Sequence, residues 1–168
     1  TVGCTNFEGA TAHGLRAALD AGVMGMQLDQ IQCYPYTSPE EDSFGCAATW
    51  IEAESAYAPT IDPTTGKRFV NELTDRKRFC DAMFEVGTPL LQIGSVDNVP
   101  DWCAESLENA LKAGVTREFN SLEEIAAEFD VPLDGLTAQM DSYNACVTAG
   151  TDTEFGKLFN PDAKPVVT

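Results

Sequence analysis

The chain has 168 residues, 43% of them hydrophobic, which suits one domain with its own core. Ten basic and 27 acidic residues give a formal net charge of −17, which argues against nucleic acid or an anionic membrane surface as a partner. No apolar run approaches the roughly 20 residues that a membrane-spanning helix requires, and the N-terminus lacks a signal-peptide pattern.

The ends of the chain, Thr1 and Thr168, lack the features of natural termini, so we expect an excised piece of a longer protein. The six cysteines form no Cys-x-x-Cys pair and are accompanied by a single histidine, so no metal site is expected. Cysteines beside apolar residues in predicted helices behave as small hydrophobes, which favours free thiols and a reducing environment. The compartment of the longer protein stays open.

The first third of the chain shows two patterns of apolar residues. Residues 11–22 predict a helix of about three turns that stops at its final glycine. Residues 24–34 alternate apolar and polar side chains, which predicts a strand with one change of phase that ends before Pro35. A polar loop is expected over residues 37–45, whereas residues 47–55 indicate a buried segment whose type the pattern leaves open.

The rest of the chain predicts one hairpin followed mostly by helices. Two strands, 57–61 and 67–70, flank a turn that Asp-Pro opens and Gly66 closes. A short strand is expected at 89–93, and helices at 74–86, 99–112, 121–129 and 132–149. Short strands and a hairpin first, then helices, indicate an α+β domain.

The stretch from Gly66 to Arg76 joins the hairpin to a helix and places Arg76 in the first turn of that helix. A cation beside free backbone N–H groups at a helix start can hold an anion. Five of the ten basic residues fall between Lys67 and Arg78, which indicates either a positive focus facing an anion or a solvated helix end. From the pattern alone, Arg76 is either a residue that binds an anion or moves a proton, or a surface arginine paired with a nearby carboxylate.

Four further positions carry possible chemistry. Tyr34, at the end of the predicted strand, could hydrogen-bond a ligand or fill the edge of the core. Glu52, near Trp50, could have a pKa raised by burial, as a proton relay needs, or could be a rim carboxylate. The only histidine, His13, has no neighbouring nucleophile in the sequence with which a triad could be argued. The small-residue turn at 9–14 could let backbone approach a cofactor.

Three blocks together resemble one protein family, and the third block is the most specific of them. They are GATAHG at 9–14 with its helix to Gly22, DQIQCYP at 29–35, and GKRFVNELTDR at 66–76. Their order and spacing look like those of soluble fumarate reductases of the flavocytochrome c type and of the related FAD-dependent enoate reductases. The similarity extends to the helices predicted in the last third and covers essentially the whole chain.

The resemblance implies a capping, or substrate-clamp, domain inserted into a large FAD-binding domain. By this comparison residues 1–25 end a segment of the FAD-binding domain, residues 26–160 form the capping domain, and residues 161–168 return toward the FAD-binding domain. The G-x-G-x-x-G dinucleotide fingerprint is absent. We therefore expect this chain not to bind FAD or turn over substrate unaided, and to need the rest of its FAD-binding domain as a partner.

The resemblance also implies a reaction, the reduction of the C=C bond of a small α,β-unsaturated carboxylic acid. FAD would deliver hydride, while Arg76 would deliver the proton, Glu52 would help to resupply it and Tyr34 would bind the substrate. No arginine follows Glu52 here, so the proton relay of the family is altered. Tyr34 stands where fumarate reductases carry a histidine, which resembles the reductases of urocanate and of other larger unsaturated acids.

The turn that lies next to the flavin in this family matches Thr11, Ala12 and Gly14, although His13 replaces its usual acidic residue. Two alternative functions stay open. A ketone or steroid flavin dehydrogenase shares the G-[KR]-R-F-V-N-E motif but generally lacks the arginine that follows it here. A non-catalytic interaction domain that retains the cap fold would account for the altered relay.

Overall fold

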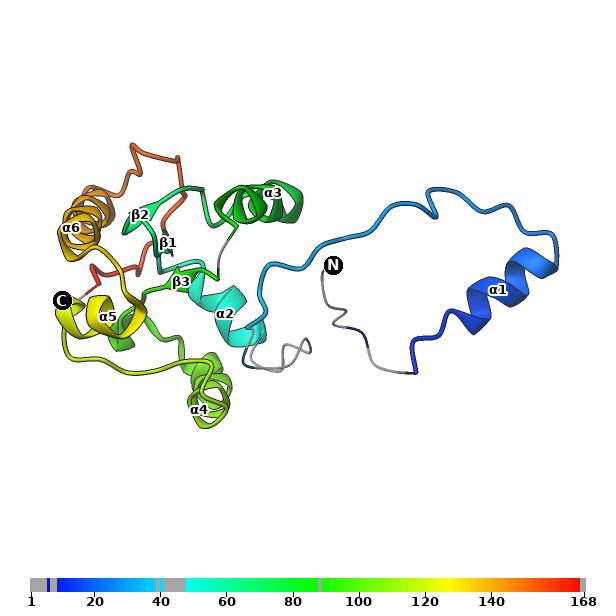
Figure 1. Cartoon of the computed structure of the whole chain (residues 1–168), viewed down its shortest axis with the longest axis horizontal. Helices are drawn as coiled ribbons and strands as arrows, with labels where there is room; N and C mark the ends of the chain where they lie inside the picture. Colours follow the sequence, from blue (N-terminus) through cyan, green and yellow to red (C-terminus); the bar gives the residue numbers. More distant parts are fainter. Residues whose placement is uncertain (1–5, 7–8, 39, 41–47, 88, 167–168) are drawn as a thin grey trace.

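The computed structural model describes residues 6, 9–38, 40, 48–87 and 89–166. Residues 48–166 form a packed body of helices around a small sheet, and residues 9–32 form an arm that stands away from the body (Figure 1). Most of the polar loop expected at 37–45 lies outside the described residues. The domain boundaries expected after residues 25 and 160 stay predictions.

The arm contains helix α1, His13–Asp20, within the helix predicted for residues 11–22. The chain leaves the helix through Gly22, whose φ of +84° favours glycine. The strand predicted for residues 24–34 is wrong, because this segment has no regular structure. No described strand pairs with it, and its apolar side chains are open to solvent, with Met24 84% and Ile31 89% exposed. Alternation alone therefore did not make a strand.

The sheet has three short antiparallel strands in the order β2–β1–β3. They are β1, Thr60–Asp62, β2, Lys67–Arg68, and β3, Leu91–Gln92. The predicted hairpin is confirmed, and Ile61 pairs with Arg68 on one side and with Leu91 on the other. Strand β2 is shorter than the predicted 67–70. The turn requires glycine at position 66, because φ is +70° and a β-carbon would collide with the backbone of helix α6.

Two helices carry the candidate residues Glu52 and Arg76. Helix α2, Ala48–Glu54, settles the segment whose type the sequence left open. Helix α3, Arg76–Val86, begins two residues later than predicted because Asp75 is its N-cap. The Asp75 Oδ1 atom accepts a hydrogen bond from the Arg78 N–H at 3.0 Å. Arg76 therefore is the first residue of α3.

The second half of the chain is helical, as predicted. The helix expected at 99–112 begins as a 3-10 turn, η3, Asp101–Cys103, and continues as α4, Ala104–Lys112; another 3-10 turn, η2, Val96–Asn98, precedes it. Helices α5, Leu122–Phe129, and α6, Leu133–Ala149, follow. The Ser121 hydroxyl caps α5 by accepting from the Glu124 N–H at 3.3 Å. The Glu124 carboxylate accepts from the Asn120 N–H at 2.8 Å rather than from the cap residue itself.

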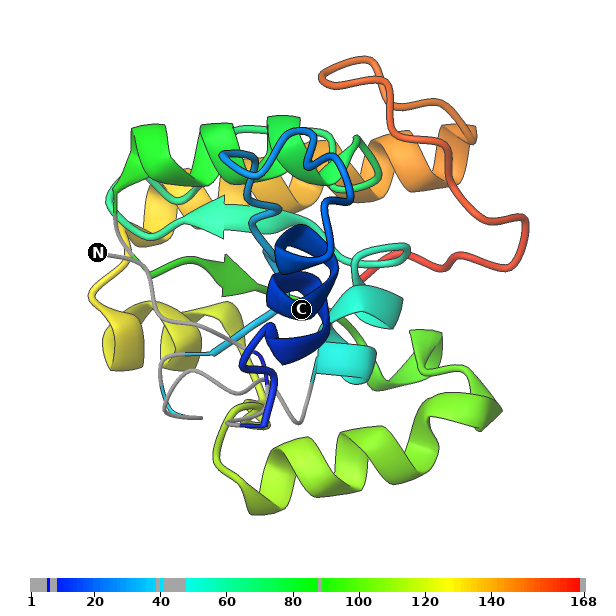
Figure 2. The same cartoon turned by 90° about the vertical axis from the view of Figure 1, so that its right-hand side faces the viewer.

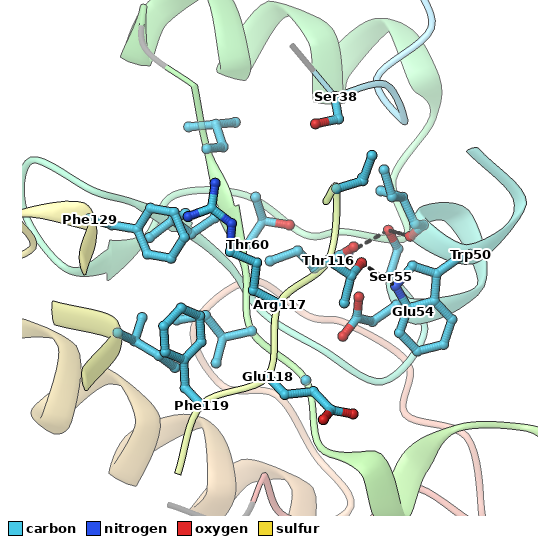
Figure 3. Close-up of a pocket in the computed structure, with 18 of the residues that line it drawn as sticks. Ser38, Trp50, Glu54, Ser55, Thr60, Thr116, Arg117, Glu118, Phe119 and Phe129 are labelled. Atoms are coloured by element: carbon cyan, nitrogen blue, oxygen red, sulfur yellow. Dashed lines mark hydrogen bonds between the residues drawn. The ribbon is translucent and has the colours of Figure 1, made fainter. Parts of the chain in front are cut away.

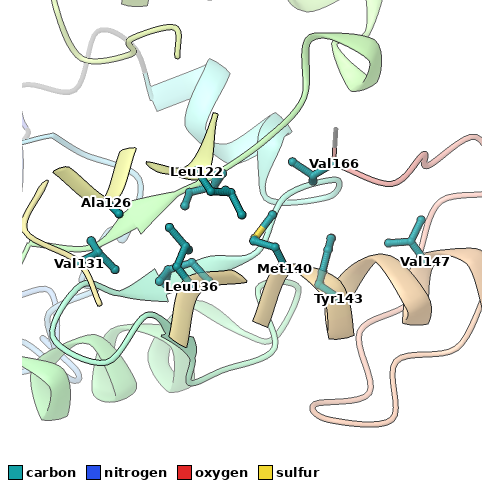
Figure 4. Close-up of a cluster of buried hydrophobic side chains, with 10 residues drawn as sticks. Leu122, Ala126, Val131, Leu136, Met140, Tyr143, Val147 and Val166 are labelled. Carbon is teal, nitrogen blue, oxygen red and sulfur yellow. The ribbon is translucent and has the colours of Figure 1, made fainter. Parts of the chain in front are cut away.

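The main core lies between the sheet and helices α5 and α6 (Figure 4). Ile61, Leu136, Met140 and Tyr143 are fully buried at its centre. A second cluster joins α2 to α4 through Trp50, Cys103 and Ala110, and a third joins α3 to the incoming chain through Tyr36, Val70 and Phe79. In the view down the arm, α3 and α6 lie along one edge of the body and α4 along the opposite edge (Figure 2). This is the α+β architecture that the sequence predicted.

Candidate functional site

A tight turn sets the position of Arg76 at the start of α3. The Asn71 side chain accepts from the Leu73 N–H at 2.9 Å, and its carbonyl accepts from the Thr74 N–H at 3.0 Å. The same side chain donates to the Phe155 carbonyl at 3.3 Å, which ties the turn to the C-terminal tail. Arg76 is thus held at a fixed exit from the hairpin, facing α2.

Arg76, Glu52 and Tyr34 meet on the face of the body beside the arm. Arg76 Nη2 lies 3.1 Å from Glu52 Oε1. The Tyr34 hydroxyl donates to Glu52 Oε2 at 3.1 Å, and the Arg76 guanidinium lies 5.0 Å from the centre of the Tyr34 ring. The three candidate residues come from α3, α2 and the segment before α2, and Tyr34 and Arg76 lie 18 and 24 positions from Glu52 in the sequence, on opposite sides of it.

Glu52 accepts one hydrogen bond from a cation and one from a phenol, so this site can hold and pass protons. The hydrogen bond between Arg76 and Glu52 raises the pKa of Arg76, so the guanidinium stays charged in the resting site. Burial, then the charge of Glu52, raises the pKa of Tyr34, which keeps the phenol protonated. The side chains of Arg76 and Glu52 are 39% and 45% exposed, so both can reach a ligand that approaches from outside.

Aromatic packing holds Tyr34 in place. The Tyr34 and Tyr36 rings meet edge-to-face with centroids 5.3 Å apart, and Tyr36 packs similarly on Phe79 of α3 at 6.0 Å. Tyr36 and Phe79 are buried, at 7% and 3% exposure. The phenol therefore rests on a fixed apolar base while its hydroxyl points to Glu52.

The positive focus considered for residues 67–78 does not form. The Arg68 side chain is fully buried and donates to Glu72 at 2.8 and 3.0 Å and to Asp152 at 3.0 Å. Its guanidinium also lies 5.0 Å from the ring centres of both Tyr143 and Phe155. Alternate residues of the motif that resembled the reductases, Gly66, Arg68, Val70 and Glu72, are thus buried, whereas Arg76 is half-exposed.

The remaining cations near Arg76 are neutralised locally. Lys77 pairs with Asp81, at 2.5 Å, and Arg78 pairs with Asp75, at 3.3 Å, both on exposed parts of α3. Such exposed pairs add little stability. Among the described residues 67–78, Arg76 is therefore the one cation that contacts another candidate residue.

Of the two environments considered for Glu52, the structure supports the rim carboxylate, because Trp50 does not cover Glu52. Trp50 is buried against α4, whereas Glu52 lies on the exposed face of α2. The carboxyl group that burial affects is instead Glu54, whose pKa rises to about 8 and is only partly lowered again by Lys157. The sequence did not point to Glu54, because the two glutamates differ only in the side of α2 that they occupy. The sequence alone does not show which side packs against α4.

The candidate flavin contacts Thr11, Ala12 and Gly14 lie at the start of α1, away from the Arg76 cluster (Figure 1). All three are exposed, and Ala12 has a φ of +57°. No side chain caps α1, and its first turn holds no acidic residue, so its open N–H groups suit a negatively charged group such as a phosphate. His13, the first residue of α1, is exposed as well.

Two further classes of site receive no support from the residues that the structure describes. In these ranges no three His, Cys, Asp or Glu side chains gather as they would around a metal ion. Within the same ranges, no helix combines the length and apolar character needed to cross a bilayer.

The chain is similar in sequence and in fold to several known proteins. No protein-family model matches the chain. It is 36% identical over 160 residues to the acrylate reductase flavoprotein subunit of Shewanella woodyi, covering 93% of this chain and 32% of that protein. It is 38% identical over 157 residues to the NADH:acrylate oxidoreductase of Vibrio harveyi, covering 91% of this chain and 15% of that protein.

The fumarate reductases are also similar. The chain is 28% identical over 160 residues to the fumarate reductase (cytochrome) of Shewanella frigidimarina, covering 95% of this chain and 27% of that protein. The solved open conformation of a flavocytochrome c3 fumarate reductase shares the fold with a TM-score of 0.67 at 20% identity, over 95% of this chain and 27% of that one. The chain is homologous to these fumarate and acrylate reductase flavoproteins, and it spans about a third or less of their length.

Proposed function

We propose that this chain is the substrate-capping part of a flavin-dependent reductase that saturates the C=C bond of a small α,β-unsaturated carboxylic acid. One observation carries the proposal: Arg76, Glu52 and Tyr34 converge on the exposed side of the body through two hydrogen bonds of 3.1 Å. The names of the relatives, acrylate and fumarate reductases, supply the substrate class.

Arg76 serves as the proton donor in this proposal. Bound FAD in its reduced state would supply hydride to one carbon of the double bond. Arg76 gives its proton to the other carbon, next to the carboxylate, so the C=C bond becomes a C–C bond with one new hydrogen on each carbon. A guanidinium is normally a very weak acid. The carbon that gains negative charge is a far stronger base than neutral guanidine, so the transfer runs downhill.

Glu52 and Tyr34 then restore the proton on Arg76. Glu52 lies between the two groups and is open to water, so a proton can pass from solvent or from the Tyr34 hydroxyl through the carboxylate. No arginine stands among residues 53–56 after Glu52, and Ser55 in this segment is buried at 1% exposure with its hydroxyl 2.7 Å from the Gln92 amide. In this proposal the Tyr34 phenol donates a hydrogen bond to the Glu52 oxygen that Arg76 does not contact.

A monocarboxylic substrate such as acrylate is favoured over a dicarboxylic one. Each carboxylate that leaves water needs a cation or several hydrogen-bond donors in the site. Among the described residues of this cluster, Lys77 and Arg78 pair with carboxylates of their own and Arg76 pairs with Glu52, so the cluster offers no second cation for a second substrate carboxylate. Two relatives with more than 30% identity are named for acrylate.

The arm would complete the catalytic assembly by joining the FAD-binding domain. In this proposal Thr11, Ala12 and Gly14 contact FAD through the open start of α1, while the capping body closes over the substrate and excludes water. The exposed apolar residues of the arm, among them Met24, Met26 and Ile31, are the surface on which that domain would pack.

The test uses the flavoprotein that contains this chain, reduced with dithionite and mixed with acrylate. Arg76→Gln should slow acrylate-dependent reoxidation of the flavin by about 10²- to 10⁴-fold, because the guanidinium proton is lost. Arg78→Gln is the matched control, since Arg78 lies on the same helix and pairs only with Asp75. Its rate should stay at the wild-type level.

Three outcomes would contradict the proposal in different ways. A rate for Arg76→Gln close to that of Arg78→Gln would remove Arg76 as proton donor. Reduction of enones in preference to acrylate would favour the ketone or steroid dehydrogenase alternative. A protein without flavin absorbance would favour the non-catalytic alternative.

A further inference from the structure

A groove of about 1260 Å³ lies between α2, β3 and the segment of residues 114–121 (Figure 3). Glu54 lines the groove, whereas Glu52 faces Arg76. Residues two apart on a helix point in nearly opposite directions, since each residue turns by about 100°. None of Arg76, Glu52 and Tyr34 lines the groove, although the groove extends to Tyr36 and Phe79, the base on which Tyr34 packs.

The Glu54 carboxyl group is set into the wall of this groove without a partner. Among the described residues, none donates a hydrogen bond to it or forms an ion pair with it. It packs against Gly94, where any β-carbon would collide with Oε1, so glycine at this position makes room for the carboxyl group. Glu54 is half-buried, and a ligand that donates hydrogen bonds would replace the water that its carboxyl group has lost.

Thr60 provides a second unsatisfied group in the same groove. It is 4% exposed, it lines the groove, and its Oγ1 atom has no hydrogen-bond partner. Thr60 pairs across the sheet with Gln92, so both side chains stand on the same face. The Gln92 amide meets the Ser55 hydroxyl at 2.7 Å, which leaves Thr60 free to face a ligand.

The walls of the groove are fixed and partly apolar. The Trp50 Nε1–H donates to Thr116 Oγ1 at 3.0 Å, which anchors the segment of residues 114–121 against α2. At the other end, Phe119 and Phe129 meet edge-to-face with centroids 5.8 Å apart. Figure 3 shows Glu54 beside Trp50 at one end of the groove, with Phe119 and Phe129 at the other.

The charges that line the groove are mainly negative. Besides Glu54, whose raised pKa keeps it largely protonated near neutral pH, its carboxyl groups are Glu40, Asp97 and Glu118, and its one cation among the described residues is Arg117. Arg117 is already paired with Glu128 at 2.6 Å. A positively charged ligand therefore matches the groove better than a neutral or negative one.

We propose that this groove binds an organic ammonium ion with an apolar body, with the ammonium group held by Glu54 and Thr60 and the apolar part packed along the groove. The site is independent of the proposed reductase activity. The ammonium N–H groups satisfy the carboxylate and the threonine oxygen, and aromatic side chains cover the apolar part. Because burial keeps Glu54 largely protonated near neutral pH, binding releases a proton to solvent. Lys157, the nearest cation acting on Glu54, is itself bonded within the core.

The test measures binding of phenethylammonium chloride to the 168-residue chain by calorimetry and tryptophan fluorescence. We expect saturable binding whose heat changes with the ionisation enthalpy of the buffer, as proton release requires. Glu54→Gln should weaken the affinity by at least about tenfold, and Thr60→Val by a smaller factor. Glu105→Gln, on the exposed first turn of α4, is the matched control and should leave the affinity unchanged.

The neutral analogue 2-phenylethanol separates the charge from the apolar body and should bind at least about tenfold more weakly. Equal affinity of the two compounds, or equal affinity of Glu54→Gln and wild type, would overturn the proposal. So would the absence of saturable binding, which would leave water as the occupant. Circular dichroism checks that each variant is folded. If Glu54→Gln does not fold, the affinity of Thr60→Val tests the proposal instead.

Discussion

Arg68 and Arg76 lie eight residues apart in the same stretch, yet their surroundings differ in every respect that matters for chemistry. The Arg68 guanidinium is fully buried between Glu72 and Asp152 and is covered by two aromatic rings. The Arg76 side chain is 39% exposed and bonds to a single carboxylate. The difference shows that one arginine holds the fold together while the other is free to meet a ligand.

The buried environment also fixes the protonation state of Arg68. Burial opposes the charge, but hydrogen bonds and charges from Glu72 and Asp152 outweigh it and raise the pKa of Arg68. Lys157 completes the arrangement by donating to the Ala58 carbonyl at 2.8 Å and to the Tyr143 hydroxyl at 3.1 Å. A group enclosed in this way cannot transfer a proton to a substrate, whatever the motif around it resembles.

The largest expected effect that separates the two arginines is on stability. Arg68→Met should lower the free energy of unfolding by about 3–5 kcal/mol, because it leaves Glu72 and Asp152 buried without their partner. Urea unfolding followed by circular dichroism measures the change. Arg76→Met is the matched control and should leave the urea midpoint unchanged. Equal losses of stability in both variants would show that Arg76 holds the fold together as Arg68 does.

Acid should act on the buried arrangement next. Although burial alone would raise the pKa of Asp152, hydrogen bonds from Arg68 and from the Lys157 and Glu154 N–H groups lower it to about 2, below the ordinary 3.8. Its contribution is therefore complete above pH 4 and is lost as the pH falls toward 2, by about 2 kcal/mol. Asp152→Asn should lack this part of the acid dependence in urea unfolding. The same acid slope in both proteins would show that Asp152 is not stabilised by the network.

The smallest effect is expected at the Arg76–Glu52 pair. Both side chains are exposed, so screening by salt should hide their attraction, and Glu52→Gln should leave the urea midpoint unchanged at low and high salt alike. In the full flavoprotein the same variant should still slow acrylate reduction. A clear loss of stability would instead make this pair part of the fold.

The sequence predicted those features that depend on neighbouring residues. The hairpin with Gly66, the helix stop at Gly150 and the place of Arg76 in the first turn of a helix are all set by local backbone chemistry. Features decided by distant contacts were not predictable. The strand expected at 24–34 lacks a partner among the described residues, and the burial of Arg68 depends on Asp152, 84 positions later.

The candidate site was predicted in its members but not in its arrangement. The resemblance named Arg76, Glu52 and Tyr34, and the structure brings these three together. It could not show which side of α2 packs on α4, so the sequence left Glu52 open between a buried and a rim carboxylate and did not single out Glu54, whose pKa is the one that burial raises. An alternation of charged residues on a short helix carries too little information to choose its buried face.

The C-terminal tail gives the order in which this domain can be completed during synthesis. Residues 151–166 have no regular secondary structure, yet they supply Asp152 and Lys157 to the centre of the molecule and Val166 to the main core. In the hairpin that leaves the ribosome first, Arg68 can therefore pair with Glu72 but must wait for its second partner, Asp152, until 84 further residues have been made. Rapid folding of the hairpin gives no stable product by itself, and a nascent chain halted before Asp152 should remain open to chaperones and proteases.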